Sequence, residues 1–119
     1  MKADLFINPL SSGDILSDSA FQSSSIAEQA LFYAAEAYSK SGKFDRAVQY
    51  YKQYIDIYAD GLYLDRAFLG LGDIYQQDPL TYTDAKSMYS KILESFPDGP
   101  VTELARQRLQ QLNLPGKIG

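Results

Sequence analysis

The sequence of 119 residues contains no cysteine and no histidine. Without cysteine there are no disulfides and no thiolate chemistry, and without histidine there is no imidazole base. Most zinc sites are excluded for the same reason, so only carboxylates and carbonyls remain as ligands for a hard cation. A catalytic triad that depends on imidazole is also excluded. We therefore expect a protein that is not an enzyme and that needs no cofactor.

Long apolar runs and clusters of like charge are missing as well. No segment reaches the roughly 18 to 20 apolar residues that cross a bilayer, and no signal-like apolar stretch follows Met1. The net charge of −4 comes from scattered residues, without a basic arm. Nucleic-acid binding needs a clustered positive surface. We expect neither membrane insertion by this chain nor a nucleic-acid partner.

Hydrophobic residues make up 45% of the chain, which is enough for one core. Residues 1–24 are rich in serine and contain Pro9 and Gly13, which is typical of an arm or linker. We therefore divide the chain into an arm at 1–24, a helical domain at 25–112 and a tail at 113–119.

From Ser25 onward, apolar residues recur at spacings of three and four, which predicts amphipathic helices. Ser25 and Glu28 are expected to form a capping box, in which each side chain satisfies a backbone N–H of the first turn. Gly42 is expected to end the first helix and Pro100 to open the last. The predicted helices span about 26–41, 44–59, 63–76, 82–96 and 100–112.

The helical domain repeats itself. Nine positions recur further along the chain with residues of matched character, and the same number of residues separates the members of every pair. A group upstream of these positions recurs at a slightly shorter separation, which pairs Ala30 with Ala67. The unit is a helix, a turn and a helix, so we predict repeats at about 26–61 and 62–99 and a capping helix at about 100–112. The nine residues are Ala47, Tyr51, Ile55, Tyr58, Asp60, Gly61, Asp65, Ala67 and Leu71, and they match Ala85, Tyr89, Leu93, Phe96, Asp98, Gly99, Glu103, Ala105 and Leu109.

The repeats carry a recognisable pattern of small and aromatic residues. The first copy reads Leu31-x2-Ala34-Ala35-x2-Tyr38, and the second reads Phe68-x2-Leu71-Gly72-x2-Tyr75. This pattern resembles the tetratricopeptide repeat, and the second copy is the closer match. The resemblance implies an all-α fold of antiparallel helix pairs, stacked as a short right-handed solenoid with a C-terminal capping helix.

The spacers between the repeats are longer than usual. The segments 58–65 and 96–101 resemble those of bacterial envelope proteins, such as the periplasmic coordinator of the Tol-Pal system and outer-membrane assembly lipoproteins. This resemblance implies a periplasmic or envelope-associated protein of bacterial origin. A cytoplasmic location is the alternative.

In this family the first helix of each pair lines a concave groove that binds a protein or peptide. An exposed Phe32–Tyr33 pair beside Leu69 is expected to anchor a peptide, unless Phe32 is buried under the N-terminal arm. The resemblance assigns the groove to Gln29, Phe32, Tyr33, Glu36, Lys40, Arg66, Leu69, Gly70, Asp73 and Gln77, with Gln107, Arg108 and Gln111 from the capping helix.

Two groups of side chains allow two interpretations each. Glu36 and Asp73 occupy matching positions, where they face a basic group or a cation, or are solvated surface charges. The ten tyrosines form either an aromatic binding surface or a core. We assign Tyr38, Tyr51, Tyr54, Tyr58, Tyr75 and Tyr89 to the core, and Tyr33, Tyr50 and Tyr63 to the surface.

These observations favour a non-catalytic scaffold that binds a protein or peptide segment in a groove. One alternative is a self-association module that forms homo-oligomers. Another is an accessory domain of a larger enzyme or of a transporter-associated ligand binder.

Overall fold

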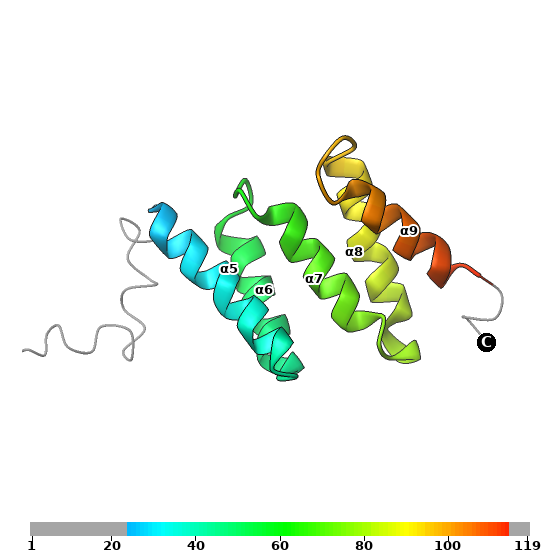
Figure 1. Cartoon of the computed structure of the whole chain (residues 1–119), viewed down its shortest axis with the longest axis horizontal. Coiled ribbons are helices and arrows are strands. Elements are labelled where there is room, and N and C mark those ends of the chain that lie inside the picture. Colours follow the sequence, from blue (N-terminus) through cyan, green and yellow to red (C-terminus); the bar gives the residue numbers. More distant parts are fainter. Residues whose placement is uncertain (1–23, 115–119) are drawn as a thin grey trace, which may run out of the picture.

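A computed structural model describes residues 24–114, and in that part of the chain all regular structure is helical (Figure 1). The predicted arm and most of the predicted tail lie outside the described residues. The helices are α5 (Ser25–Lys40), α6 (Phe44–Ile57), α7 (Leu64–Tyr75), the short 3-10 helix η1 (Pro79–Thr81), α8 (Tyr82–Ser95) and α9 (Thr102–Leu112).

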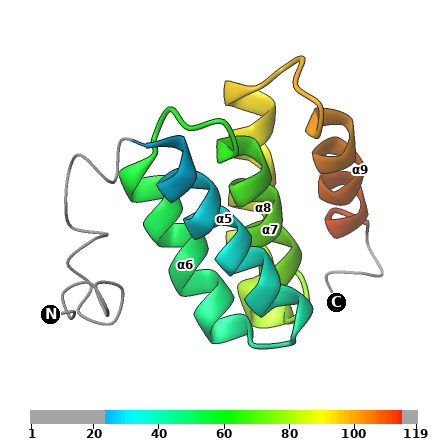
Figure 2. The ribbon, with the colours of Figure 1, turned by 60° about the vertical axis from the view of Figure 1, so that its left-hand side comes forward.

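The helices stand side by side as antiparallel neighbours, in an order that follows the sequence. Figure 1 shows the row from α5 to α9, and Figure 2 shows that α5 and α7 lie on one side of it while α6 and α8 lie on the other. The α5–α6 and α7–α8 pairs make the most extensive contacts, followed by α8–α9 and α6–α7. This is the all-α, helical-repeat solenoid that the sequence predicts.

The first helix begins and ends with local signals. The Ser24 side chain caps α5 by accepting a hydrogen bond from Ala27 N at 3.1 Å. The predicted capping box at Ser25 is therefore wrong by one residue, and Glu28 reaches Tyr54 and Leu62 instead of the helix start. Gly42 follows the helix with a φ of 78°, the left-handed conformation expected of it.

The last helix begins two residues later than predicted, at Thr102 rather than Pro100. The Thr102 hydroxyl accepts a hydrogen bond from Gly99 N at 3.0 Å and donates one to the Phe96 carbonyl oxygen. The side chain is 3% exposed. Because these bonds hold Gly99–Val101 as a turn across the end of α8, Pro100 lies in the turn and not in the helix.

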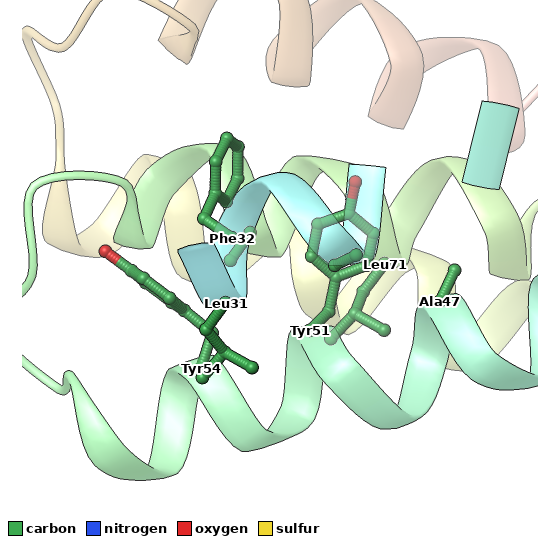
Figure 3. Close-up of a cluster of buried hydrophobic side chains, with 8 residues drawn as sticks. Leu31, Phe32, Ala47, Tyr51, Tyr54 and Leu71 are labelled. Atoms are coloured by element: carbon green, nitrogen blue, oxygen red, sulfur yellow. The ribbon is translucent and has the colours of Figure 1, made fainter. Parts of the chain in front are cut away.

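The buried side chains form two clusters that follow one another along the row. The first joins α5, α6 and α7, and Figure 3 shows part of it, including Leu31, Tyr51 and Leu71. The second joins α7, α8 and α9 around Tyr89 and Ile92. Each cluster is closed by the next helix along the chain, which is how stacked repeats bury a continuous core.

Small residues lie where the helices approach most closely. Ala35, Ala47 and Ala85 are all fully buried. A β-carbon on Gly72 would lie 2.6 Å from Cε1 of Tyr89, so only glycine leaves room for that ring against α7. The small residues of the repeat pattern thus have the packing role that the sequence predicts.

Candidate binding groove

A groove of about 330 Å³ opens between α5 and α7, with Tyr51 of α6 lining it from beneath. Six of the predicted residues line it together: Glu36, Lys40, Arg66, Leu69, Gly70 and Asp73. The other lining residues are Ser39, Tyr51 and Val101. The groove therefore gathers side chains from two neighbouring repeats.

A larger hollow of about 530 Å³ lies at the turn between α5 and α6, where residues 42–46 line it. One short stretch of chain forms this hollow, whereas three helices and the α8–α9 turn converge on the groove. The groove is the better candidate site because side chains far apart in the sequence meet in it.

The other predicted residues lie around the groove without lining it. Gln29 and Gln77 are exposed, toward the first turn of α5 and after the end of α7, and Tyr33 is 48% exposed. Gln107 and Gln111 are also exposed, on α9. Arg108 reaches the groove through Asp73, to which it donates a hydrogen bond.

Phe32 is fully buried, so the expectation that it is an exposed anchor is wrong. Its ring stacks on that of Tyr63 with centroids 4.7 Å apart and an angle of 8° between the planes. The Arg66 guanidinium covers the ring at 4.8 Å from its centroid. Burial of Phe32 was the alternative interpretation, but the described side chains that cover it belong to α6, α7 and the spacer.

Tyr50 and Tyr63, which we assigned to the surface, are partly buried and pack against the first core cluster. Tyr63 lies in the spacer before α7, where helical periodicity gives no information about the direction of a side chain. Tyr50 packs edge-on against Tyr38, with ring centroids 5.2 Å apart. The exposure predicted for Tyr33 is confirmed.

One end of the groove is closed by a network of three side chains. Tyr89 donates a hydrogen bond to Oδ1 of Asp73 at 2.7 Å, and Arg108 binds Oδ2 of the same carboxylate. Burial raises the pKa of the Tyr89 hydroxyl, and its bond to Asp73 raises it further. Both oxygens of Asp73 are therefore already engaged.

The other carboxylate of the groove is less engaged. Glu36 forms a long ion pair with Arg66, in which Oε1 and Nη2 lie 3.9 Å apart, too far for a hydrogen bond. Nearby, Tyr51 is only 2% exposed. Burial raises the pKa of its hydroxyl, the carboxylates of Glu36 and Asp73 raise it further, and Arg66 opposes them. The electrostatic potential at the Tyr51 hydroxyl is thus negative on balance.

Gly70 allows Tyr51 to reach the groove. A β-carbon on Gly70 would lie 2.6 Å from the Tyr51 hydroxyl oxygen, so the phenol occupies the space of the missing side chain. Our interpretation of the sequence assigned Tyr51 to the core and left it out of the groove. It has both roles, because its ring packs in the core while its hydroxyl ends at the groove lining.

The arrangement is suited to binding. Cations, carboxylates, hydroxyls and two aliphatic side chains line the groove together, as in sites that recognise a peptide segment. Within residues 24–114 there is no cluster of three histidine, cysteine or acidic side chains that is placed to hold a metal ion. None of the helices described is long and apolar enough to cross a membrane.

The geometry defines a helical-repeat protein with a groove on one side. Residues 29–61 match the family described as tetratricopeptide repeat. The match falls on the first predicted repeat, although by residue pattern we expected the second to be closer. Comparison with curated proteins and with solved structures gives no match. Tetratricopeptide repeats typically mediate protein–protein interactions and are not catalytic.

Proposed function

We propose that the protein is a non-catalytic scaffold that binds a segment of another protein in the groove between α5 and α7. One observation carries this proposal: side chains from both repeats converge on a single open groove in a chain that matches the tetratricopeptide repeat at residues 29–61. Leu69 supplies an apolar contact, and the charged residues around it supply polar ones.

Site-specific crosslinking tests the proposal. A photoreactive amino acid in place of Lys40 lies in the groove, whereas the same group in place of Lys86 lies on α8 away from the groove lining. In extract from the native organism, position 40 should crosslink a defined partner and position 86 should not. Equal crosslinking from both positions would contradict the groove as the binding site.

A pair of substitutions adds a matched control. Leu69→Ala should weaken capture of that partner by about tenfold, because a lost apolar contact costs on the order of 1–2 kcal/mol. Leu80→Ala changes the same side chain in the α7–α8 loop, where it is 89% exposed, and should leave capture unchanged. The helical circular-dichroism signal is expected to stay the same in both variants.

Self-association is a second candidate, supported by an apolar stripe on α5. Ile26 and Tyr33 are 72% and 48% exposed, and the exposed Ala30 and Ala37 lie on the same face at spacings of three and four residues. Another copy of the chain would cover such a stripe. Sedimentation at several concentrations tests this candidate, and a strictly monomeric species at high concentration would exclude it.

We also propose a location in the bacterial cell envelope. The support is the resemblance of the two long spacers to those of envelope proteins. Fractionation of the native organism tests this proposal. Recovery of the protein in the cytosolic fraction alone would contradict it.

A further inference from the structure

The second repeat contains a complete polar network that uses one residue from each of three helices. Asp73 of α7 provides the carboxylate, Tyr89 of α8 provides a hydroxyl, and Arg108 of α9 provides the cation. The two donors take different oxygens of the carboxylate. The network therefore shows which groups satisfy a carboxylate and a tyrosine in this position of the fold.

The first repeat has the same position, but its third helix supplies no cation there. The internal self-match relates Asp73 to Glu36 and Tyr89 to Tyr51. The offset that separates the two tyrosines also relates Arg108 to Gly70, which has no side chain. The first repeat thus keeps the carboxylate and the tyrosine, and the Tyr51 hydroxyl, which lies against Gly70, borders the groove of about 330 Å³.

Both remaining groups have unmet hydrogen-bonding capacity. Among residues 24–114, the Tyr51 hydroxyl makes no hydrogen bond, although the side chain is only 2% exposed. A buried polar group without a partner destabilises a protein, so such a group needs an explanation. Glu36 also accepts no hydrogen bond from the described residues, and its nearest cationic atom is 3.9 Å away.

The neighbouring cations do not fill the position. Arg66 is held over the Phe32 ring at 4.8 Å and over the Tyr63 ring at 5.5 Å, which keeps its guanidinium beyond hydrogen-bond distance of Glu36. Lys40 is exposed and makes no ion pair with a described residue. At the Tyr51 hydroxyl, the two carboxylates outweigh Arg66, so a cation is favoured there over an anion.

We propose that an arginine side chain of the bound segment enters this position and pairs with Glu36 beside the Tyr51 hydroxyl, as Arg108 pairs with Asp73 beside the Tyr89 hydroxyl. The proposal rests on the proposed function, because it names the chemistry that the groove recognises. A planar guanidinium suits the position since it reaches a carboxylate and a neighbouring oxygen together. Arg108 thus represents, within the chain itself, the side chain that we expect the groove to recognise in its ligand.

Model peptides test the proposal without knowledge of the partner. The probes are the capped pentapeptide Ala-Ala-Arg-Ala-Ala and the same peptide with citrulline or glutamate in place of arginine. They are titrated into the full chain and followed by amide NMR. The arginine peptide should shift the amides of Glu36 and Gly70 with a dissociation constant on the order of 1 mM. Citrulline, which has nearly the same shape without the charge, should bind at least about tenfold more weakly.

Three variants distinguish recognition from a merely structural role. Glu36→Gln should weaken arginine-peptide binding by about tenfold, whereas Glu94→Gln makes the same charge change on an exposed part of α8 and should leave it unchanged. Tyr51→Phe should weaken binding several-fold while the midpoint of urea unfolding stays the same or rises. A fall in that midpoint would mean that the hydroxyl has a structural partner, and it would overturn the role of Tyr51.

Each remaining outcome also decides the proposal. Equal binding of the arginine and citrulline peptides, preference for the glutamate peptide, or no shift up to about 10 mM peptide would overturn it. Native-partner crosslinking from position 40 is independent of these results. If that crosslinking succeeds and Glu36→Gln does not reduce it, the groove function stands and the arginine inference fails. If position 40 crosslinks nothing, the groove function itself fails.

Discussion

Three buried tyrosines in this protein use their hydroxyl groups differently. Tyr54 donates to Oε2 of Glu28 at 2.5 Å and accepts from Tyr63 N at 2.8 Å. Tyr89 donates to Asp73, and the Tyr51 hydroxyl has no hydrogen-bond partner among the described residues. Figure 3 shows that the rings of Tyr51 and Tyr54 leave α6 in different directions. The same substitution at these positions should therefore have different effects on stability.

Tyr54→Phe is expected to lower the free energy of unfolding by about 1–3 kcal/mol, because it leaves Tyr63 N without its acceptor and removes one of the two donors to Glu28. Tyr51→Phe removes the same oxygen from a comparably buried ring and is expected to change that energy by less than about 0.5 kcal/mol, or to raise it. Urea unfolding of the two variants measures the difference. Equal destabilisation would show that the hydroxyls are equivalent.

Stability should fall in alkaline solution. Burial raises the pKa of Tyr51, Tyr54 and Tyr89 above the ordinary value of 10, with additional contributions from neighbouring carboxylates. Above about pH 10 the unfolded chain loses these protons first, so the folded chain binds more protons and stability decreases as pH rises. Each tyrosine contributes up to about 1.4 kcal/mol per pH unit.

Urea unfolding between pH 8 and pH 11.5 measures this dependence. Tyr54→Phe serves as the matched variant, because its stability should decrease less steeply with pH, by the contribution of one tyrosine. Absorbance of tyrosinate in folded and unfolded protein identifies the titrating groups. A stability that is constant through pH 11 would contradict the prediction.

At the scale of single residues, the sequence predicted burial on the helices better than in the spacers. Periodicity correctly placed Tyr51, Tyr54 and Tyr89 in the core. It failed for Phe32 because the ring that covers it, Tyr63, comes from the spacer before α7. The direction of a spacer side chain depends on tertiary contacts, and no local pattern encodes those contacts.

The helices themselves were predictable to within about two residues, because apolar spacing and Gly42 mark them locally. Their starts were less predictable. Positions 23–25 are all serine, so the sequence alone does not show which of them caps α5, and the extended Ser24 is the one that does. Glu28 would complete a capping box only if its carboxylate were not engaged by Tyr54.

The start of α9 provides a test at the scale of one element. Thr102→Val keeps the shape of the side chain but removes the hydroxyl that connects Gly99 N and the Phe96 carbonyl. We expect the free energy of unfolding to fall by about 1–2 kcal/mol. Thr83→Val, on an exposed position of α8, is the control and should have little effect. Thermal unfolding distinguishes the two variants, and equal melting temperatures would contradict the role of this turn.

At the scale of the whole molecule, the internal self-match predicted the stacking, since a repeated sequence places equivalent helices in equivalent neighbourhoods. The assignment of groove residues came from the family resemblance, and part of that set lines the pocket between α5 and α7. The self-match did not predict that Asp73 and Glu36 differ in their pairing. That difference depends on the third helix of each network, which supplies Arg108 in one case and Gly70 in the other.

The two core clusters predict how the molecule should respond to loss of α9. Deletion of residues 100–119 removes Ala105 and Leu112 from the second cluster and leaves Tyr89 and Ile92 open to solvent on one side. The first cluster loses no member, because it is built from α5, α6 and α7. In a stacked repeat, stability is transmitted mainly between neighbours.

Native-state hydrogen exchange measures this response. The deletion should accelerate exchange in α8 by more than about tenfold relative to α6, since each exposed core side chain costs on the order of 1.5–3 kcal/mol. Deletion of residues 115–119 alone leaves α9 intact and should leave both helices protected. Equal acceleration in α6 and α8 would mean that the five helices unfold as one cooperative unit. In that case, ligand binding in the groove would stabilise α9 as strongly as α5.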